Sequence, residues 1–450
     1  MRCRRYLSVV LLCLVPAVAV MASEADELKI ITQAVEKATP ADVALFRTHA
    51  ETGDPRAQFM LSLAYQNGAG TGVNREEAFR WCMRAAEQGF ALAQNELGSM
   101  YSQGIGTAQD QAEATRWFRR AADQGSQMGQ FNLGVCYMIG RGVAKNLPEA
   151  AKWYRMSAGQ GYRDAQYNLG LLYVKGAGVD LSMEEGAKWF LKAASQGDPD
   201  AEDKLGRMAL FGEGIPKSDT DAARWFQAAA DVGNAEAEYH LGNLYRRGRG
   251  VPPDNVEAVR WLTKAAEHGN IEAQTNLGLM LADGTGVPKD CTRGVEWLRK
   301  AAENGDAAGQ NNLGVFYTRG YCMKQNSQLA FEWVTKAAEQ GLADAEALLA
   351  AMYDEGSGTK KNPELAVRWY GKSAEQGNVK AQCNLAVMCA KAQGTARDVV
   401  AAYQWLVLAE RGGETSCLDL KPLLESGITP EQISEANRRV SDWESKHRHN

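Results

Sequence analysis

The sequence GSQMGQFNLGVCYMIGRGVAKNLPEAAKWYRMSAGQG, residues 125–161, decides the fold because the rest of the chain repeats it. Its tryptophan, Trp153, belongs to a series in which one tryptophan follows another every 36 residues. The series is Trp81, Trp117, Trp153, Trp189, Trp225, Trp261, Trp297, Trp333, Trp369 and Trp405. A constant period without insertions indicates that one supersecondary unit is stacked many times.

Ten such repeats fill residues 54–413, so the chain of 450 residues is one repeat array and not several globular domains. The predicted repeats are 54–89, 90–125, 126–161, 162–197, 198–233, 234–269, 270–305, 306–341, 342–377 and 378–413. Residues 23–53 and 414–450 are predicted to form capping helices, because an open-ended array must cover its terminal core layers.

The first half of each repeat has the periodicity of a helix, which we call helix A. In the first repeat Ala57, Leu61 and Tyr65 are four residues apart and therefore share one buried stripe. The residue after the leucine is Gly, Ser or Ala in every repeat, which predicts the close passage of a second helix. Helix A should end at a glycine pair such as Gly140 and Gly142, since glycine accepts the left-handed conformation of a helix C-terminus.

The second half of each repeat predicts another helix, helix B. Its start is marked by a residue that can accept a hydrogen bond from a free helix N–H. These predicted N-caps are Asn74, Asp110, Asn146, Ser182, Ser218, Asp254, Asp290, Asn326, Asn362 and Asp398. Acidic residues three positions later are predicted to complete capping boxes. They are Glu77, Glu113, Glu149, Glu185, Asp221 and Glu257.

These residues resemble the Sel-one-like repeat (SLR) family, a 36-residue relative of the tetratricopeptide repeat. The shared pattern is Ala-x-x-x-Leu-Gly-x-x-Tyr-x-x-Gly-x-Gly-Val, followed by Ala-x-x-Trp-Tyr/Phe-x-x-Ala-Ala-x-x-Gly. The resemblance implies an all-α fold, a right-handed α-α superhelix (solenoid) of ten helix-turn-helix repeats. It also implies an adaptor or binding scaffold, although the repeat itself specifies neither partner nor substrate.

Residues 1–22 differ from the repeats. Three arginines among the first five residues precede an apolar run over 7–20, and small residues follow near Ala22. This pattern is typical of a secretory signal peptide, so we expect an exported protein, periplasmic or secreted. No second long apolar run occurs, and the net charge is −5, so we expect neither stable membrane insertion nor a nucleic-acid partner.

The two flanks carry their own helix signals. Pro40 should separate a first helix over 24–38 from a segment that resembles helix B. Residues 414–425 resemble another helix A, with Lys421 where the leucine belongs, and Thr429 should open a final helix.

The mature chain would keep seven cysteines, an odd number, in an oxidising compartment. Cys82, Cys136 and Cys389 stand at core positions and are interpreted as buried thiols. The other four form two candidate disulfide pairs on neighbouring repeats. The pairs are Cys291 with Cys322 and Cys383 with Cys417.

No catalytic, cofactor or metal site is expected. The five histidines form no ligand cluster, and the glycine pairs follow helices and not strands, so they do not indicate a nucleotide loop. Lactam hydrolysis, proposed for Cys-rich SLR relatives, is a remote alternative here, because those relatives link helix A to helix B within each repeat. This sequence lacks that pattern.

Two features bear on binding surfaces. Helix B carries basic residues three positions after the tryptophan, which we interpret as a solvated outer face. Helix A carries variable residues opposite its buried stripe, where the inner, concave surface of a solenoid would lie. Aromatic and basic residues there are candidates for peptide or protein contacts. They are Phe131, Tyr167, Arg207, Tyr239, Asn243, Arg246 and Arg247. The alternative for these aromatics is packing between repeats.

We therefore predict a non-enzymatic scaffold that binds a protein or peptide on helix A. A second hypothesis is a secreted or surface-exposed bacterial factor that binds host proteins. Repeats five, seven and ten depart from the pattern, because Ala209, Leu281 and Cys389 replace the tyrosine, and a local weakness or a local role is expected there.

Overall fold

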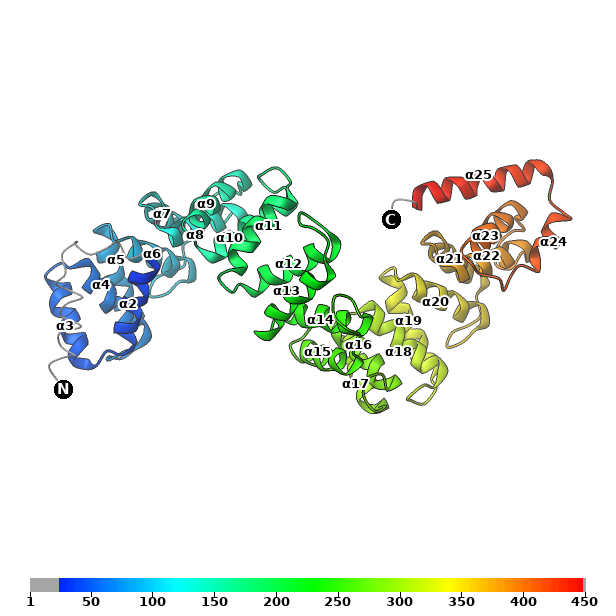
Figure 1. The fold of residues 1–450 in the computed structure, drawn as a ribbon, viewed down its shortest axis with the longest axis horizontal. Coiled ribbons are helices and arrows are strands. Elements are labelled where there is room, and N and C mark those ends of the chain that lie inside the picture. Colours follow the sequence, from blue (N-terminus) through cyan, green and yellow to red (C-terminus); the bar gives the residue numbers. More distant parts are fainter. Residues whose placement is uncertain (1–23, 448–450) are drawn as a thin grey trace. The chain divides into compact units, whose positions relative to one another are not determined.

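The computed structural model of the protein describes residues 24–447, and the predicted signal peptide at 1–22 lies outside them. All 24 helices of the described range are labelled α2 to α25, and this range contains no strand. The predicted all-helical solenoid of helix-turn-helix repeats is confirmed (Figure 1).

Each repeat contributes one helix A and one helix B. The A helices are α4 (Pro55–Asn67), α6 (Ala91–Gln103), α8 (Gln127–Ile139), α10 (Arg163–Lys175), α12 (Pro199–Phe211), α14 (Ala235–Arg247), α16 (Ile271–Asp283), α18 (Ala307–Arg319), α20 (Ala343–Glu355) and α22 (Val379–Lys391). The B helices are α5 (Arg75–Glu87), α7 (Gln111–Asp123), α9 (Leu147–Gly159), α11 (Met183–Ala194), α13 (Asp219–Asp231), α15 (Asn255–Glu267), α17 (Cys291–Glu303), α19 (Ser327–Glu339), α21 (Pro363–Glu375) and α23 (Val399–Arg411). The chain divides into two compact units between Ala229 and Ala230, within α13.

The small residue after the helix A leucine is needed for close helix approach, as predicted. A Cβ atom on Gly134 would lie 2.7 Å from the ring of Tyr154 in the next helix, and one on Gly98 would lie 2.6 Å from the ring of Phe118. In the first repeat Ser62 fits the same position because its hydroxyl donates a hydrogen bond to the carbonyl of Ala78 at 2.7 Å.

All ten predicted N-caps of helix B accept a backbone hydrogen bond through their side chains. The predicted capping boxes at these helices are wrong in their second half. The backbone N–H of Asn74 already donates to the carbonyl of Tyr65 at 2.9 Å, so the carboxylate of Glu77 pairs with Arg80 at 2.8 Å instead. The same pairing recurs with Glu257 and Arg260.

The tryptophans of the series differ in how deeply they are buried. Trp81, Trp117, Trp153, Trp261 and Trp405 are buried, whereas the remaining members of the series are half-buried. Basic side chains three positions later lie over the indole rings at 3.7 to 4.8 Å from the ring centroid. They are Arg84, Arg120, Lys192, Lys264, Lys300, Lys336 and Lys372. The basic stripe of helix B is thus partly a cover for the tryptophans, through cation–π contacts.

The flanking segments form helices of their own. At the N-terminal end α2 (Glu24–Glu36) and α3 (Pro40–Glu51) are separated before Pro40, as predicted. At the C-terminal end, only α24 (Leu420–Glu425) forms where another helix A was suggested, and α25 (Pro430–His447) then packs against α23. Lys421 pairs with Glu410 at 2.8 Å and therefore does not enter a core layer.

Candidate functional site

The predicted contact residues of the first unit lie on α8, α10 and α12. Phe131 and Tyr167 are half-buried, and Arg207 is exposed. The ring of Phe131 lies 5.1 Å from that of Tyr162, and the ring of Tyr167 lies 5.6 Å from that of Phe190. These aromatics therefore pack between helices on one side while leaving part of the ring accessible.

A buried carboxylate stands beside this part of the first unit. Asp203 is 2% exposed and lies 3.4 Å from the ammonium group of Lys204. Burial raises the pKa of Asp203, whereas the positive charges of Lys204 and Arg207 lower it. Burial and the neighbouring aspartates raise the pKa of Tyr167 to about 12, so its hydroxyl stays protonated and can donate a hydrogen bond. Tyr167, Asp203 and Arg207 form what we call the repeat-four/five patch.

The predicted residues of the second unit lie together on α14. Asn243 donates a hydrogen bond to the carbonyl of Tyr239 at 3.1 Å and accepts one from Arg246 at 3.2 Å. Its side-chain oxygen also accepts a bond from Asn276 on the next helix A at 3.3 Å. Arg246 and Arg247 are exposed, whereas Tyr239 is half-buried. The amide of Asn243 thus already has partners, and the two arginines provide the accessible charge.

The N-terminal helix α2 occupies the corresponding face of the first repeat. Phe59 stands at the same repeat position as Phe131, Tyr167 and Tyr239, yet it is only 2% exposed. Ile31 and Val35 of α2 share one buried core with Phe59, and α2 packs against α4 (Figure 1). Helix A of the first repeat therefore already packs against a further helix of the same chain.

The first residue of α2 is tied to the start of α8. The carboxylate of Glu24 accepts hydrogen bonds from the hydroxyl of Ser126 and from the backbone N–H of Gln127, the latter at 2.8 Å. A negative charge is favourable at this place because the free N–H groups of a helix start point toward it. Glu27 of α2 also forms an ion pair with Arg56 of α4 at 2.8 Å.

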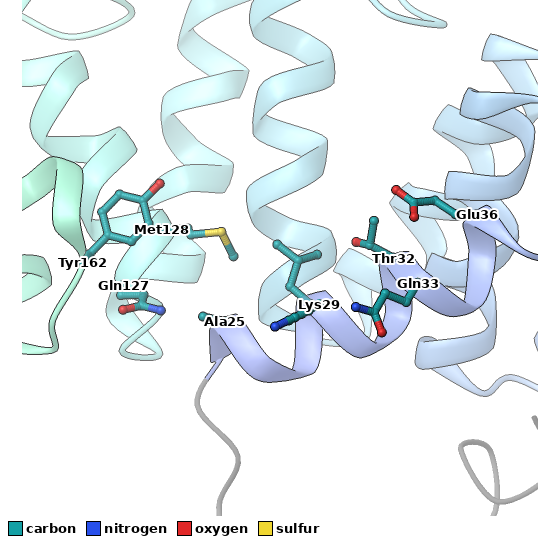
Figure 2. Close-up of a pocket in the computed structure, with 9 residues that line it drawn as sticks. Ala25, Lys29, Thr32, Gln33, Glu36, Gln127, Met128 and Tyr162 are labelled. Carbon is teal, nitrogen blue, oxygen red and sulfur yellow. The ribbon is translucent and has the colours of Figure 1, made fainter. Parts of the chain in front are cut away.

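A hollow of about 550 Å³ lies between α2 and the third and fourth repeats. Figure 2 shows Lys29, Thr32 and Gln33 on α2 facing Met128 and Tyr162 across it. The hollow mixes apolar and polar side chains and is open to solvent. The sequence did not reveal it, because the position of α2 depends on contacts between residues about 100 positions apart.

A ladder of glutamines, buried on helix A and exposed at the end of helix B, links successive repeats, and sequence reasoning missed it. The amide of Gln166 donates to the carbonyl of Ala158 at 3.2 Å and accepts a bond from Gln196 at 2.8 Å. The same arrangement links Gln58 with Gln88, Gln94 with Gln124, Gln130 with Gln160, and Gln310 with Gln340. The recurrence of glutamine at these two positions was the available signal. Its role is structural, because both ends of each amide are used within the chain.

The cysteines fall into two groups in the structure. Cys82, Cys136 and Cys389 are buried, and burial raises the pKa of each thiol, so these groups stay protonated and unreactive. The sulfur atoms of Cys291 and Cys322 are 2.01 Å apart, and those of Cys383 and Cys417 are 2.23 Å apart.

Within residues 24–447 no group of His, Cys, Asp or Glu side chains is arranged to hold a metal ion. Over the same residues, no helix combines the length and the apolar character that crossing a membrane requires.

Comparison with known protein families shows the family to which this chain belongs. The family model of the Sel1 repeat matches the chain ten times. The matches are 55–90, 91–126, 127–162, 163–198, 199–234, 235–270, 271–306, 307–342, 343–378 and 379–414. The chain belongs to the Sel1 repeat family. Among curated proteins, no relative matches it.

Two solved structures of Sel1 repeat (SLR) proteins are similar over most of this chain. One is a protective antigen of uropathogenic Escherichia coli strains with an SLR fold. It is 32% identical, the match covers 90% of this chain and 94% of the antigen, and the TM-score is 0.65. The other is a Sel1 repeat protein from Oxalobacter formigenes, 31% identical, for which the match covers 77% of this chain and 99% of that protein, with a TM-score of 0.54.

Proposed function

We propose that this Sel1 repeat protein is an exported, non-enzymatic scaffold that binds a protein or peptide on the exposed face of its A helices. The observation that carries the proposal is the packing of α2 on the first repeat. There a helix of the same chain packs on α4 and shares one buried core with Phe59, the counterpart of Tyr167 and Tyr239, which supports the binding of a polypeptide on this face.

The repeat-four/five patch is the proposed contact region of the first unit. The accessible part of Tyr167 would pack against an apolar side chain of the partner, and Arg207 would pair with a carboxylate. In the second unit Arg246 and Arg247 would serve the same purpose beside Tyr239. The proposed partner therefore combines apolar and acidic side chains.

A catalytic role has little chemical support in the described residues. A cysteine nucleophile requires a thiolate, and burial raises the pKa of the three unpaired thiols above the ordinary value. We therefore propose a binding function and not the lactam hydrolysis considered for Cys-rich relatives.

Export is supported by the apolar segment at 7–20 and by the two cysteine pairs. Disulfides persist mainly in oxidising compartments. We propose that Cys291 bonds to Cys322 and Cys383 bonds to Cys417 in the mature protein. Mass spectrometry of peptides from the unreduced protein should recover both linked pairs, whereas recovery of all four cysteines as free thiols would contradict the proposal.

A second candidate function is the binding of host proteins by a bacterial surface or secreted factor. It is favoured by the likeness to the protective antigen of uropathogenic Escherichia coli, at 32% identity over nearly the whole chain. Surface labelling of intact cells tests it, because a protein confined to the periplasm would not be labelled.

The binding proposal is tested by affinity capture from the native compartment with three versions of the full chain. Changing Tyr167, Arg207 and Tyr239 together to alanine should abolish capture of the wild-type partner while the helical circular dichroism is retained. The matched control changes Lys188, an exposed basic residue of helix B, to alanine and should leave capture unchanged. Undiminished capture by the triple variant would refute the site.

A further inference from the structure

A second hollow, of about 510 Å³, opens in the first unit beside Trp225 of the fifth repeat. Its walls include Ala209 at the end of α12, Ile215 of the following turn, and Trp225 and Ala228 of α13. Arg224 and Asp221 stand at its rim and form an exposed ion pair at 3.3 Å. It is distinct from the helix A face proposed above, because it is formed mainly by the turn and by helix B, and Ala209 at the end of helix A belongs to the buried side of that helix.

The hollow lies where other repeats place a tyrosine ring. Ala209 is the counterpart of Tyr137 in the third repeat, two periods earlier. Tyr137, the turn residue Val143 and Trp153 all pack against one core cluster there. In repeat five the counterparts Ile215 and Trp225 also pack against a core cluster, but together with Ala209 they border open space. The loss of one ring therefore accounts for the hollow.

A second substitution uncovers the same tryptophan. In the fourth repeat the ammonium group of Lys192 lies 3.7 Å from the centroid of the Trp189 ring. At the corresponding position of the fifth repeat stands Ala228, whose side chain is too short to cover the indole. Trp225 is half-buried and lines the hollow with part of its ring.

A third difference concerns the position where the hydroxyl group of the missing tyrosine would lie. The guanidinium of Arg155, in helix B of the third repeat, donates a hydrogen bond to the hydroxyl of Tyr173 in the fourth repeat at 3.0 Å. The counterpart of Arg155 one repeat later is Leu191, which is 42% exposed. A ring in the place of the missing tyrosine would thus have no guanidinium at this position, so a hydroxyl group on it would gain no counterpart of that hydrogen bond.

We propose that this hollow binds the side chain of a phenylalanine on a protein partner. The ring would take the place that Tyr137 and Tyr173 occupy in their own repeats, against Trp225, Ile215 and Ala209. Arg224 at the rim would accommodate the carbonyl oxygens of the partner's main chain. That the ring belongs to a protein rests on the proposed scaffold function, whereas the preference for an unsubstituted ring rests on the hollow alone.

The probe for the test is N-acetyl-L-phenylalaninamide, added to the full mature chain labelled with 5-fluorotryptophan. The ¹⁹F resonance of Trp225 is assigned by its absence from a Trp225→Phe variant. Titration should shift this resonance to saturation, and N-acetyl-L-alaninamide should not shift it. N-acetyl-L-tyrosinamide should bind no more tightly, because its hydroxyl finds no counterpart of Arg155. The absence of a saturable shift, or tighter binding of the tyrosine probe, would overturn the proposal.

Two variants close the hollow in different ways. Ala209→Phe supplies the ring from the chain itself, and Ala228→Lys places a cation over Trp225, as Lys192 does over Trp189. Each should weaken probe binding by about tenfold or more, a difference of about 1.4 kcal/mol. Matched controls add the same groups at exposed positions outside the hollow, Leu181→Phe and Val256→Lys, and should bind as the wild type does.

Thermal unfolding shows whether each variant is folded. If one of the two variants does not fold, the other still tests the proposal. Binding that persists unchanged in the folded variants would overturn the proposal. The result also separates this inference from the scaffold function. Capture of the partner through Tyr167 and Arg207 is measured without N-acetyl-L-phenylalaninamide. Binding of this probe beside Trp225 is measured without the partner, so either result can fail alone.

Discussion

The third and fourth repeats are sealed by side chains that the fifth repeat lacks. In repeat four Tyr173 receives a hydrogen bond from Arg155, and Lys192 covers Trp189. In repeat five the corresponding tyrosine and lysine are Ala209 and Ala228. Yet α10 and α12 have the same length, 13 residues. The residues that form the two helices are therefore not the residues that cover the tryptophan. An individual repeat can lose the covering side chains and expose a hollow while it keeps its helices.

The glutamine ladder shows the same contrast. Gln166 and Gln196 of repeat four join it to repeat three, because Gln166 donates to the carbonyl of Ala158 and Gln196 donates to Gln166 and to the carbonyl of Gly161. The next residues in the two series are Glu202 and Val232, so the pair of amides is not repeated. One repeat has thus lost three recurring contacts while keeping its leucine, its glycine and its helix caps.

The largest expected effect comes from removing a tryptophan in each type of repeat. Trp153→Ala should lower the free energy of unfolding by about 3–5 kcal/mol, because a buried indole leaves a cavity. Trp225→Ala should cost about half as much, since Trp225 is already half-buried beside a hollow. Chemical denaturation followed by circular dichroism measures both. Equal losses would show that Trp225 is as tightly packed as Trp153.

The second prediction exchanges the residues at the tyrosine position of repeats four and five by mutation. Tyr173→Ala should destabilise the chain by about 2–3 kcal/mol, because it removes a ring and the hydroxyl that Arg155 binds. Ala209→Tyr should stabilise it by up to about 1 kcal/mol by filling the hollow. Differential scanning calorimetry of each variant tests the pair, and a loss of stability in Ala209→Tyr would mean that the hollow does not fit a ring.

The glutamine ladder predicts a smaller difference. Gln166→Ala should cost about 1–2 kcal/mol, because the amide of Gln196 and the carbonyl of Ala158 each lose a buried partner. Glu202→Ala, at the counterpart of Gln166 in repeat five, should change the stability by less than about 0.5 kcal/mol. The urea concentrations at which the two variants are half unfolded measure both losses. Equal midpoints would show that the glutamine ladder does not stabilise the contact between repeats.

The smallest expected effect is a dependence on pH that arises at Asp203. Burial raises its pKa above the unfolded value of about 3.9, so the folded state binds more protons and the free energy of unfolding falls as the pH rises through that range. Asp203→Asn should remove this part of the pH dependence, which lies above about pH 4. Asp180→Asn, at an exposed position, is the control. Identical melting profiles for both variants would contradict the assignment.

Much of the fold could be predicted because its determinants are local. The N-caps, the glycine-terminated helix A and the small residue at Gly134 act through neighbours within one repeat, and periodicity makes each of them visible ten times. The capping boxes failed for an equally local reason. The N–H of Asn74 was already bonded to the carbonyl of Tyr65, and a sequence pattern does not display that competition.

The candidate sites could be predicted only in part, because they depend on contacts between distant residues. The variable positions of helix A remain predicted contact positions, and the buried core that Phe59 shares with α2 follows from tertiary packing. The absence of the tyrosine at Ala209 was visible in the sequence. That it leaves a hollow, and not a collapsed core, required the positions of Ile215 and Trp225.

Site-specific photo-crosslinking tests most directly whether the exposed face of the A helices binds a protein. A photoreactive amino acid replaces Tyr167 on α10 in one version of the full chain and Lys188 on α11 in another, and both are expressed in the native compartment. We expect a discrete crosslinked protein from position 167, lost when Arg207 is also changed to alanine, and none from position 188. Crosslinking from position 188 alone, or from neither position, would contradict the account.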